Sequence, residues 1–391
     1  MSTIRKSGWQ SLRTLPVPAR WVARSIMRAS AARAWLPHSS WMQLRSREIM
    51  ANPKVSFIVP VYNTQEFLPR CLDSLLGQTC LDIEIVVVND GSPDDSAAII
   101  DKYACKDSRV CVVEKSNGGL SSARNAGMDV ACGDIIDFVD SDDYIEPNLA
   151  EFLVDAFAKE HPEIVVFGAE CEPAELASKR IKQLLSPEAR AFESFDPALL
   201  FSVNAQPYVW RAAYSRELVE REYLRFAENV QFAEDVVFQF ESYPLSAKTV
   251  VAPDKLYHYV MQGKSLTHTF NAGAKRMDKV GAHLLVLYEV LERWGRRGLL
   301  DLCPGELVTW FLDLVVFDLA RLDVENYAAA VASVKGEFWQ YFGSSWTDLP
   351  SAIAVRNVAR KIAAGAGVSL IDVVRLYLST RGLKACIERF V

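Results

Sequence analysis

The sequence predicts an α/β fold in which a mostly parallel sheet is flanked by helices and followed by a helical C-terminal region. Between residues 53 and 143, short apolar runs of strand length alternate with longer amphipathic stretches. Strands that alternate with helices form right-handed βαβ units and therefore parallel pairs. From residue 271 onward, strand-like runs become rare and helical periodicity prevails.

The elements of the first region have clear boundaries. A proline closes the first expected strand, and the turn pair Asp90-Gly91 follows the second. The expected strands are residues 55–60, 83–88, 110–114 and 135–139, and the expected helices are residues 67–76, 95–104 and 121–131. Ligands of such sheets bind at the carboxyl ends of the strands. Polar residues occupy these ends at Tyr62-Asn63, Asn89-Asp90 and Asp140–Asp143.

Three regions are expected along the chain. They are a basic N-terminal arm over residues 1–52, a catalytic domain over residues 53–270 and a helical region over residues 271–391. The whole chain carries a net charge of −6, but its first 50 residues hold nine Lys or Arg and one acid. That segment is therefore at +8 and the remainder at −14, which indicates a basic arm on an acidic enzyme body.

The arm has a composition that suits a membrane surface. Arg20, Arg24 and Arg28 share one face at helical spacing, and four tryptophans are scattered around them. Basic residues combined with tryptophan favour an anionic lipid surface. A disordered tail, or a start of translation at Met50, is the alternative. No motif indicates binding to nucleic acid.

Cysteine usage and hydropathy predict a cytoplasmic location. The eight cysteines form no Cys-x-x-Cys pair and no compact cluster with histidine, so a zinc site and a disulfide framework are not expected. No apolar run reaches the ~18 residues of a membrane span. Asp313 and Asp318 interrupt Leu307–Leu319, one of the longest candidates. No signal peptide is recognisable. We expect the catalytic part in the cytoplasm, peripheral to the inner face of the cell membrane.

Three carboxylates, Asp140, Asp142 and Asp143, directly follow the fourth expected strand. Carboxylates this close repel one another unless something neutralises them. Mg²⁺ and Mn²⁺ prefer oxygen ligands and are commonly held by one or two carboxylates together with substrate phosphates. We therefore expect a Mn²⁺ or Mg²⁺ site here. A solvated acidic turn, or caps for a helix that starts near Glu146, is the alternative.

Four segments in this order make the sequence resemble glycosyltransferase family 2, whose members have the GT-A fold with a Rossmann-like sheet. The segments are Val59–Asn63, Val88–Ser92, Asn117–Gly127 and Asp140–Asp143. The resemblance is strong over residues 54–170 and weaker over residues 205–268. It implies an inverting, metal-dependent transferase that uses a nucleotide-sugar donor.

The resemblance implies where the donor binds. The implied contacts are Pro60, Val61, Tyr62, Asp90, Arg124, Asp140 and Ser141. Val61 and Tyr62 would line the base pocket, and Asp90 would accept a hydrogen bond from the base N–H, which suits uracil. Taken alone, Asp90 belongs to a plain turn.

The same resemblance implies how the diphosphate is held. Arg124 would lie near the base or the diphosphate, Asp140 would contact the ribose or the metal, and Asp142 would be the main metal ligand. Taken alone, Arg124 is more typical of a solvated helix face.

The acceptor side depends on Glu234 and Asp235, two adjacent acids inside an apolar stretch. Burial raises the pKa of a carboxylate and improves it as a base. The resemblance implies Asp235 as the catalytic base, with Glu234 binding the acceptor or supporting the loop. Capping of a helix N-terminus is the alternative.

The sequence departs from the family pattern at two places. The family usually carries Asn or Lys where Arg211 and Ala212 stand, and often Arg where Gln262 stands. Trp210 is expected either to stack on a sugar ring or to fill the core. His258 is expected to pack at the surface, with metal ligation as the alternative.

The C-terminal region is expected to pack onto the catalytic domain or onto a dimer partner. Its last helix should present one apolar face, with Asp372 and Arg375 directed away from it. That face consists of Leu370, Val373, Val374, Tyr377 and Leu378. Docking at a membrane near a lipid-linked acceptor is the alternative.

The predicted function is transfer of a sugar from a UDP-linked donor to a hydroxyl of a glycan or lipid-linked acceptor in surface polysaccharide or glycoconjugate synthesis. A nucleotidyltransferase is one alternative, but it usually needs a Gly-rich basic loop where residues 60–64 stand. A non-catalytic sugar-binding scaffold is the other, but it would lack the acids.

Overall fold

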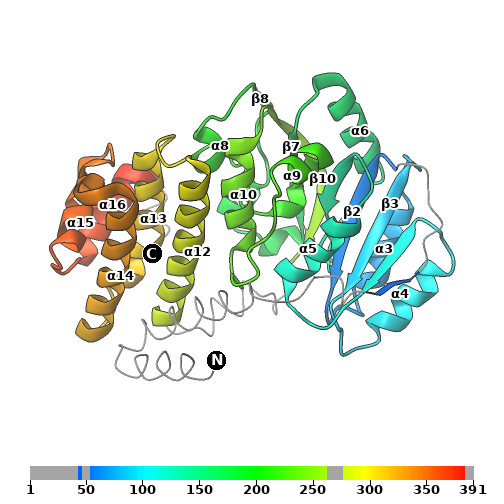
Figure 1. The fold of residues 1–391 in the computed structure, drawn as a ribbon, viewed down its shortest axis with the longest axis horizontal. Coiled ribbons are helices and arrows are strands. Elements are labelled where there is room, and N and C mark those ends of the chain that lie inside the picture. Colours follow the sequence, from blue (N-terminus) through cyan, green and yellow to red (C-terminus); the bar gives the residue numbers. More distant parts are fainter. Residues whose placement is uncertain (1–42, 46–52, 262–275, 384–391) are drawn as a thin grey trace, which may run out of the picture. The chain divides into compact units, whose positions relative to one another are not determined.

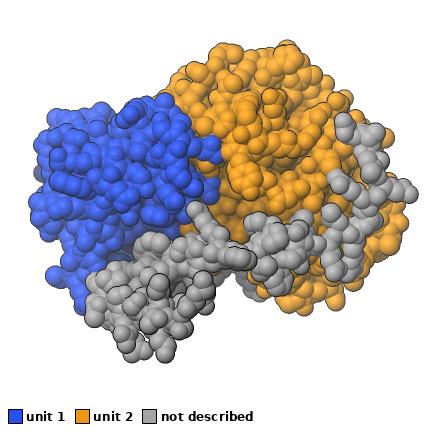
Figure 2. Space-filling view, in the orientation of Figure 1, with its two compact units in different colours: residues 1–35, 266–391 blue, residues 36–265 orange. Residues whose placement is uncertain are grey.

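The computed structural model describes residues 43–45, 53–261 and 276–383. These residues fall into two compact units, one within residues 36–265 and the other formed by the described part of residues 266–391 (Figure 2). The first unit is α/β and the second is helical (Figure 1). Most of the predicted basic arm lies outside the described residues, and so does Gln262.

The described residues of the first unit form a ten-stranded sheet. Four neighbouring strands are parallel, in the order β4-β3-β2-β5. Their bounds are β2 Val55–Val61, β3 Ile83–Asn89, β4 Val110–Glu114 and β5 Ile135–Phe138. The helices between them are α3 Leu68–Leu76, α4 Ser96–Ala104 and α5 Leu120–Val130. All seven predicted elements are confirmed to within one residue at each end.

Helices cover both faces of β2, which explains why all of its residues are buried. Val55, Phe57 and Val59 belong to one core with the apolar residues of α3 and of α6, Leu149–Glu160. Ile58 points to the other face, toward α5. At Gly127 the helix approaches so closely that a Cβ would lie 2.3 Å from Cγ2 of Ile58. Residue 127 must therefore be glycine for α5 to pack this closely on β2.

Beyond β5 the sheet is mixed rather than parallel. β9 pairs antiparallel with both β5 and β7, β10 runs parallel to β7, and β6 and β8 pair antiparallel with β10. A short strand, β1, pairs antiparallel with β4 at the opposite edge. The bounds are β1 Gln43–Arg45, β6 Tyr144–Ile145, β7 Ile164–Glu172, β8 Arg190–Phe192, β9 Ala212–Ser215 and β10 Thr249–Val260. The parallel prediction therefore describes the first half of the sheet.

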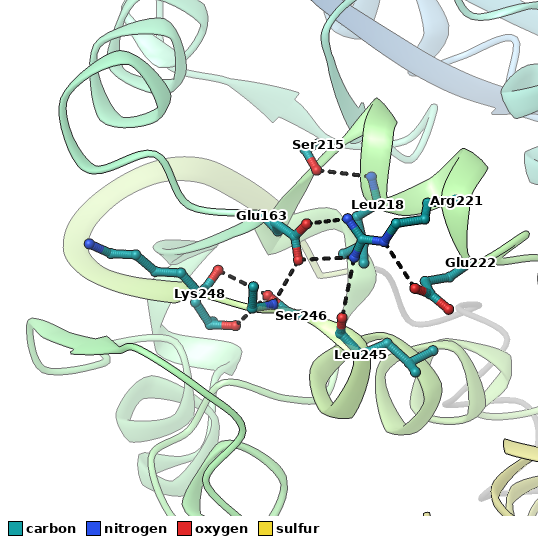
Figure 3. Close-up of polar contacts among 10 residues, drawn as sticks. Glu163, Ser215, Leu218, Arg221, Glu222, Leu245, Ser246 and Lys248 are labelled. Carbon is teal, nitrogen blue, oxygen red and sulfur yellow. Dashed lines mark hydrogen bonds and ion pairs between the residues drawn. The ribbon is translucent and has the colours of Figure 1, made fainter. Parts of the chain in front are cut away.

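Short helices connect the later strands. Their bounds are η3 Ala174–Leu176, α7 Lys179–Leu184, α8 Ala198–Phe201, η4 Val209–Arg211, α9 Arg216–Arg221 and α10 Glu234–Leu245. A polar network at the start of β7 fastens two of them to the sheet (Figure 3). Glu163 accepts hydrogen bonds from Arg221 at the end of α9 (2.6 Å) and from the N–H of Ala247, after α10 (2.7 Å). Although burial opposes ionisation, these donors lower the pKa of Glu163.

The second unit packs its helices around buried aromatic rings. Its elements are α12 Arg276–Arg297, α13 Pro304–Leu319, α14 Val324–Phe342, η5 Gly343–Asp348, α15 Ile353–Ala363 and α16 Leu370–Thr380. Trp294 and Phe311 are fully buried, and Phe338 stacks on Trp346 with ring centroids 5.0 Å apart. None of the described helices is both long and apolar enough to cross a bilayer.

The apolar face predicted for α16 is wrong in part. Val373 and Tyr377 are buried as expected, but Leu370 and Leu378 are exposed. Asp372 is buried instead, because its carboxylate caps the start of the helix and pairs with a lysine of α15 at 2.7 Å. The bonds from the cap and from the lysine offset the cost of burying this charge.

Candidate active site

The carboxyl ends of β2, β3 and β5 lie side by side, so the loops that follow them meet. Thr64, after β2, hydrogen bonds through its hydroxyl to that of Ser141, after β5 (2.9 Å). The N–H of Asn63 donates to the hydroxyl of Ser92, after β3 (2.7 Å). These bonds tie together three of the segments on which the family resemblance rests.

Asp90 holds the turn that leads into α5. Its carboxylate accepts hydrogen bonds from the N–H groups of Gly118 (2.9 Å) and Gly119 (2.8 Å) and forms an ion pair with Lys115. The residue is only 2% exposed. Each carboxylate oxygen has two lone pairs, so capacity for a further donor remains. The turn and the predicted base contact are thus compatible functions of one side chain.

The predicted base-pocket residues of β2 differ in exposure. Pro60 and Val61 are buried, and the side chain of Val61 belongs to the core. Tyr62 is 50% exposed. A direct side-chain contact by Val61 therefore does not fit its position, whereas the ring of Tyr62 is accessible to a planar ligand.

The three acids after β5 have different environments. Asp143 is buried and accepts hydrogen bonds from the Tyr257 hydroxyl (2.8 Å) and the N–H of Val260 (2.7 Å). Burial, together with the other two acids, raises the pKa of Asp143 well above its usual range. Burial and Asp140 raise the pKa of the half-buried Asp142 to about 6. Asp143 thus anchors the segment to β10, and Asp140 and Asp142 remain as candidate ligands.

A metal fits this pair on the chemistry of its donors. Within the described residues, no three His, Cys, Asp or Glu side chains are arranged to hold an ion by themselves. Mg²⁺ and Mn²⁺ sites commonly use one or two carboxylates and complete the shell with phosphate oxygens and water. Repulsion between Asp140 and Asp142 is the unfavourable term that a divalent cation would remove.

Arg124 joins the two halves of the site. It is 2% exposed on α5 and donates to Asp140 (2.8 Å) and to Glu234 (2.8 Å). Although burial alone would disfavour its charge, the two carboxylates raise the pKa of Arg124. The alternative of a solvated helix face is wrong. Two of its donors are engaged by carboxylates, so the residue acts first as a brace between them.

Glu234 and Asp235 occupy the first turn of α10. Burial, with Asp235 next, raises the pKa of Glu234 to about 7 against the opposing charge of Arg124. Burial also raises the pKa of Asp235, again opposed by Arg124. Asp235 accepts a hydrogen bond from the N–H of Tyr208 (2.8 Å). The pKa of each acid is therefore raised, which strengthens its carboxylate as a base, and both carboxylates bond residues of other elements rather than merely capping the helix.

Two residues singled out from the sequence lie in packed positions. Trp210 is 3% exposed and stacks on Tyr208 and Tyr257, with ring centroids 4.9 and 4.2 Å away. It fills the core and offers no face to a sugar. His258 bonds Glu146 through Nε2 (2.6 Å) and stacks on Tyr144, which confirms that it packs against neighbouring side chains.

Sequence reasoning missed the role of Tyr257. Its hydroxyl donates to Asp143 and accepts from the N–H of Asp140 (3.1 Å), so it fixes the acidic segment from β10. No local pattern indicates this role, because the partners of Tyr257 are more than 110 residues away in the sequence. The only local signal is a tyrosine in an apolar strand, which is common.

Comparison with known proteins bears on this geometry. The family model described as "Glycosyl transferase family 2" matches residues 56–221. The glycosyltransferase EpsJ of Bacillus subtilis (strain 168) is 38% identical over 225 residues, which cover 55% of this chain and 63% of EpsJ, less than two thirds of its length. EpsH of the same organism is 33% identical over 244 residues, which cover 61% of this chain and 68% of EpsH.

The fold is also similar to that of a solved structure. The crystal structure of S. aureus TarS 1-349 in complex with UDP-GlcNAc aligns with a TM-score of 0.64 at 21% identity. The alignment covers 84% of this chain and 92% of that chain. At this identity the likeness concerns the fold, and it confirms the predicted α/β sheet with a helical C-terminal region.

Proposed function

Because the chain belongs to glycosyltransferase family 2, we propose that it transfers a sugar from a UDP-linked donor to a hydroxyl of a glycan or lipid-linked acceptor with inversion. The observation that carries this proposal is the buried Arg124, which bonds Asp140 on the donor side and Glu234 on the acceptor side. A single rigid side chain thereby sets the spacing of two acidic groups, as a displacement between two bound substrates requires.

The donor is proposed to bind along the ends of β2, β3 and β5. Tyr62 offers an exposed ring for the base, and Asp90 retains lone pairs for the N–H of uracil. Pro60 and Val61 shape this end of β2 from the core. The solved TarS complexes with UDP and UDP-GlcNAc support the choice of uracil.

Asp142, assisted by Asp140, is proposed to hold Mn²⁺ or Mg²⁺. When bound, a divalent cation would offset the charge that develops on the departing diphosphate. Arg124 keeps Asp140 in place through its 2.8 Å bond, and the Ser141 hydroxyl keeps the segment against Thr64. The protein thus supplies a prearranged pair of oxygen ligands.

The proposed reaction is a single displacement. Asp235 accepts the proton of the acceptor hydroxyl, whose oxygen then forms a bond to the anomeric carbon. The bond between that carbon and the UDP oxygen breaks, and its electron pair leaves with UDP. Attack from the face opposite to UDP inverts the anomeric configuration. Glu234 binds the acceptor or, through Arg124, supports the loop.

The flanking regions are proposed to serve location and assembly. We assign catalysis to residues 53–270, and contacts with the catalytic domain or a second copy to residues 271–391. The basic arm, residues 1–52, is proposed to bind anionic lipid at the cytoplasmic face, near a surface-polysaccharide or glycoconjugate acceptor. The full chain should float with anionic vesicles, and a chain without residues 1–52 should not. Recovery of the full chain in the lipid-free bottom fraction would contradict the assignment.

A panel of nucleotide sugars with Mn²⁺ tests the central proposal. UDP release should occur with a UDP-sugar and fall by at least about 100-fold in chelator and in Asp142→Ala. Asp155→Ala, which removes an exposed carboxylate from α6, is the matched control and should keep full activity. Product anomers are read by NMR.

Each alternative has its own signature in that assay. Activity of Asp142→Ala in chelator would contradict the metal assignment, and a product with retained configuration would contradict single displacement. Release of pyrophosphate would indicate a nucleotidyltransferase. Binding of donors without any turnover would indicate a scaffold.

A further inference from the structure

One face of α10 carries three polar side chains that all hold the same segment. Asp235, Gln239 and Tyr243 follow one another at four-residue spacing, so they lie on one stripe of the helix. Asp235 accepts from the N–H of Tyr208 (2.8 Å), and Gln239 donates from Nε2 to the carbonyl of the same Tyr208 (3.3 Å). The Tyr243 hydroxyl donates to the carbonyl of Ala205 (2.6 Å).

The start of this segment is anchored separately by Arg211. This arginine is fully buried, and its guanidinium donates to the carbonyls of Asn204 (2.5 Å) and Leu184 (2.6 Å). Burial lowers the pKa of Arg211 to about 10. Arg211, one of the residues at which the sequence departs from the family pattern, therefore holds the backbone at Asn204 and Leu184 from inside the protein.

Tyr208 has an unusual backbone conformation. Its φ of 77° lies in the left-handed region, which costs a residue other than glycine about 1–3 kcal/mol. Such a conformation persists only when the surroundings determine it, and here both the N–H and the carbonyl of Tyr208 are bonded to α10. The Tyr208 N–H can point to Asp235 only while the backbone keeps this conformation. The bond from Gln239 to the carbonyl of Tyr208 helps to maintain it.

We propose that Gln239 is a positioning residue of the transfer reaction, which fixes Tyr208 so that its N–H orients the Asp235 carboxylate toward the acceptor hydroxyl. The inference rests on the proposed role of Asp235 as base. Asp235 has one oxygen bonded to Tyr208 and the other to the N–H of Val236 (2.8 Å), which leaves defined lone pairs to accept a proton. Gln239 is fully buried, so it acts on the reaction through Tyr208 and Asp235.

Gln239→Met tests the inference, because methionine has a similar volume and cannot donate to Tyr208. We expect kcat to fall about 10- to 100-fold while the KM for the donor stays within about 2-fold, since only the base is displaced. Tyr243→Phe is the matched control: it removes a buried bond from the same stripe, but one that ends on Ala205. Its kcat should stay within about 2-fold of the wild-type value.

A double-variant cycle separates positioning from general damage. In an Asp235→Asn background, Gln239→Met should have no further effect on kcat, because no base remains to be oriented. A further loss by the same factor, an unchanged kcat in Gln239→Met alone, or equal losses in Gln239→Met and Tyr243→Phe would overturn the inference. A wild-type kcat in Asp235→Asn alone would instead refute Asp235 as the base. The single variant therefore tests the proposed function separately from the positioning role of Gln239.

Discussion

The two sides of the site hold their carboxylates on different kinds of backbone. On the proposed donor side, Asp90 is bonded by the N–H groups of a glycine turn, and left-handed φ values fall on Gly91 (65°), Gly119 (87°) and Asn63 (57°), of which asparagine tolerates this region better than most residues. On the acceptor side, Asp235 is bonded by Tyr208, and left-handed φ values fall on Tyr208 (77°) and Ala233 (60°). Glycine adopts such values freely, whereas other residues must be forced into them.

The difference shows where each geometry is encoded. On the donor side, local sequence places glycine or asparagine wherever the backbone is left-handed, although the bonds from Gly118 and Gly119 to Asp90 span 28 and 29 residues. The acceptor side is specified by bonds from other elements, such as Gln239 and Arg211, and it carries strain. Substitutions of Arg124, of Asp137 and of the left-handed residues Gly91 and Ala233 test this difference between the two sides.

Arg124→Met should have the largest effect, because Arg124 braces both sides at once. The substitution leaves two acids, Asp140 and Glu234, without their buried cation. Loss of one partner from a buried ion pair costs about 3–5 kcal/mol. Urea denaturation should show a loss of unfolding free energy in that range, and sugar transfer should fall with it.

Arg124→Lys is the conservative counterpart. Lysine keeps the charge but lacks the planar fork that reaches two carboxylates, so the loss of stability should be smaller while transfer still falls. If Arg124→Met lost less than about 1 kcal/mol, the two sides would be independent and the brace would be refuted.

Asp137 marks the border between the sides and should make stability depend on pH. It lies on β5, between parallel β2 and antiparallel β9, and is fully buried with a hydrogen bond from the N–H of Phe138 (2.9 Å). Burial raises the pKa of Asp137 well above its usual value, so the folded protein retains a proton that the unfolded chain releases above about pH 4.

The sign of the effect follows directly. Between the unfolded and the folded pKa, the wild-type unfolding free energy falls by up to about 1.4 kcal/mol per pH unit from this group. Asp137→Asn removes that contribution, so its stability relative to wild type should rise with pH. Urea denaturation at pH values from about 5 to 8 measures the difference; parallel curves for the two proteins would contradict the assignment.

A pair of glycine exchanges should have the smallest effect and addresses the backbone difference itself. Gly91→Ala places a Cβ 2.9 Å from the N of Asn117 at a left-handed φ, and should cost about 1–2 kcal/mol. Ala233→Gly relieves a left-handed alanine while increasing the freedom of the unfolded chain, so its net effect should stay within about 1 kcal/mol. Thermal denaturation of both variants decides; an equal loss in both would mean that Ala233 carries no strain.

The sequence predicted the elements around the proposed donor side well because their signals are local. Strand and helix periods, and turns with glycine, placed every element between residues 55 and 139 to within one residue. The acids after β5 were identified for the same reason: a carboxylate that follows a buried strand must lie at the end of the sheet. The order and direction of the later strands were not predictable, because they depend on pairings between distant segments.

The contacts that complete the site illustrate this limit. Arg124 and Glu234 are 110 residues apart, and Asp143 and Tyr257 are 114 apart. Periodicity in one sequence carries no information about which distant donor reaches which acid. The bond from Arg124 to Glu234 was not predictable for this reason. The expectation that Asp372 would face solvent was wrong for another reason, because Ser369 and Lys361, which bind its carboxylate, lie only 3 and 11 residues away.

The bond between Tyr257 and Asp143 also imposes an order on biosynthesis. Tyr257 is added to the growing chain 114 residues after Asp143. At translation rates of about 5–20 residues per second, this interval lasts roughly 6 to 23 seconds. During that time the acidic segment lacks the hydroxyl that fixes it, although the strand before it can already pair. The last strand of the sheet therefore completes the first half of the site, and a nascent chain acquires its donor side only after its acceptor side has emerged.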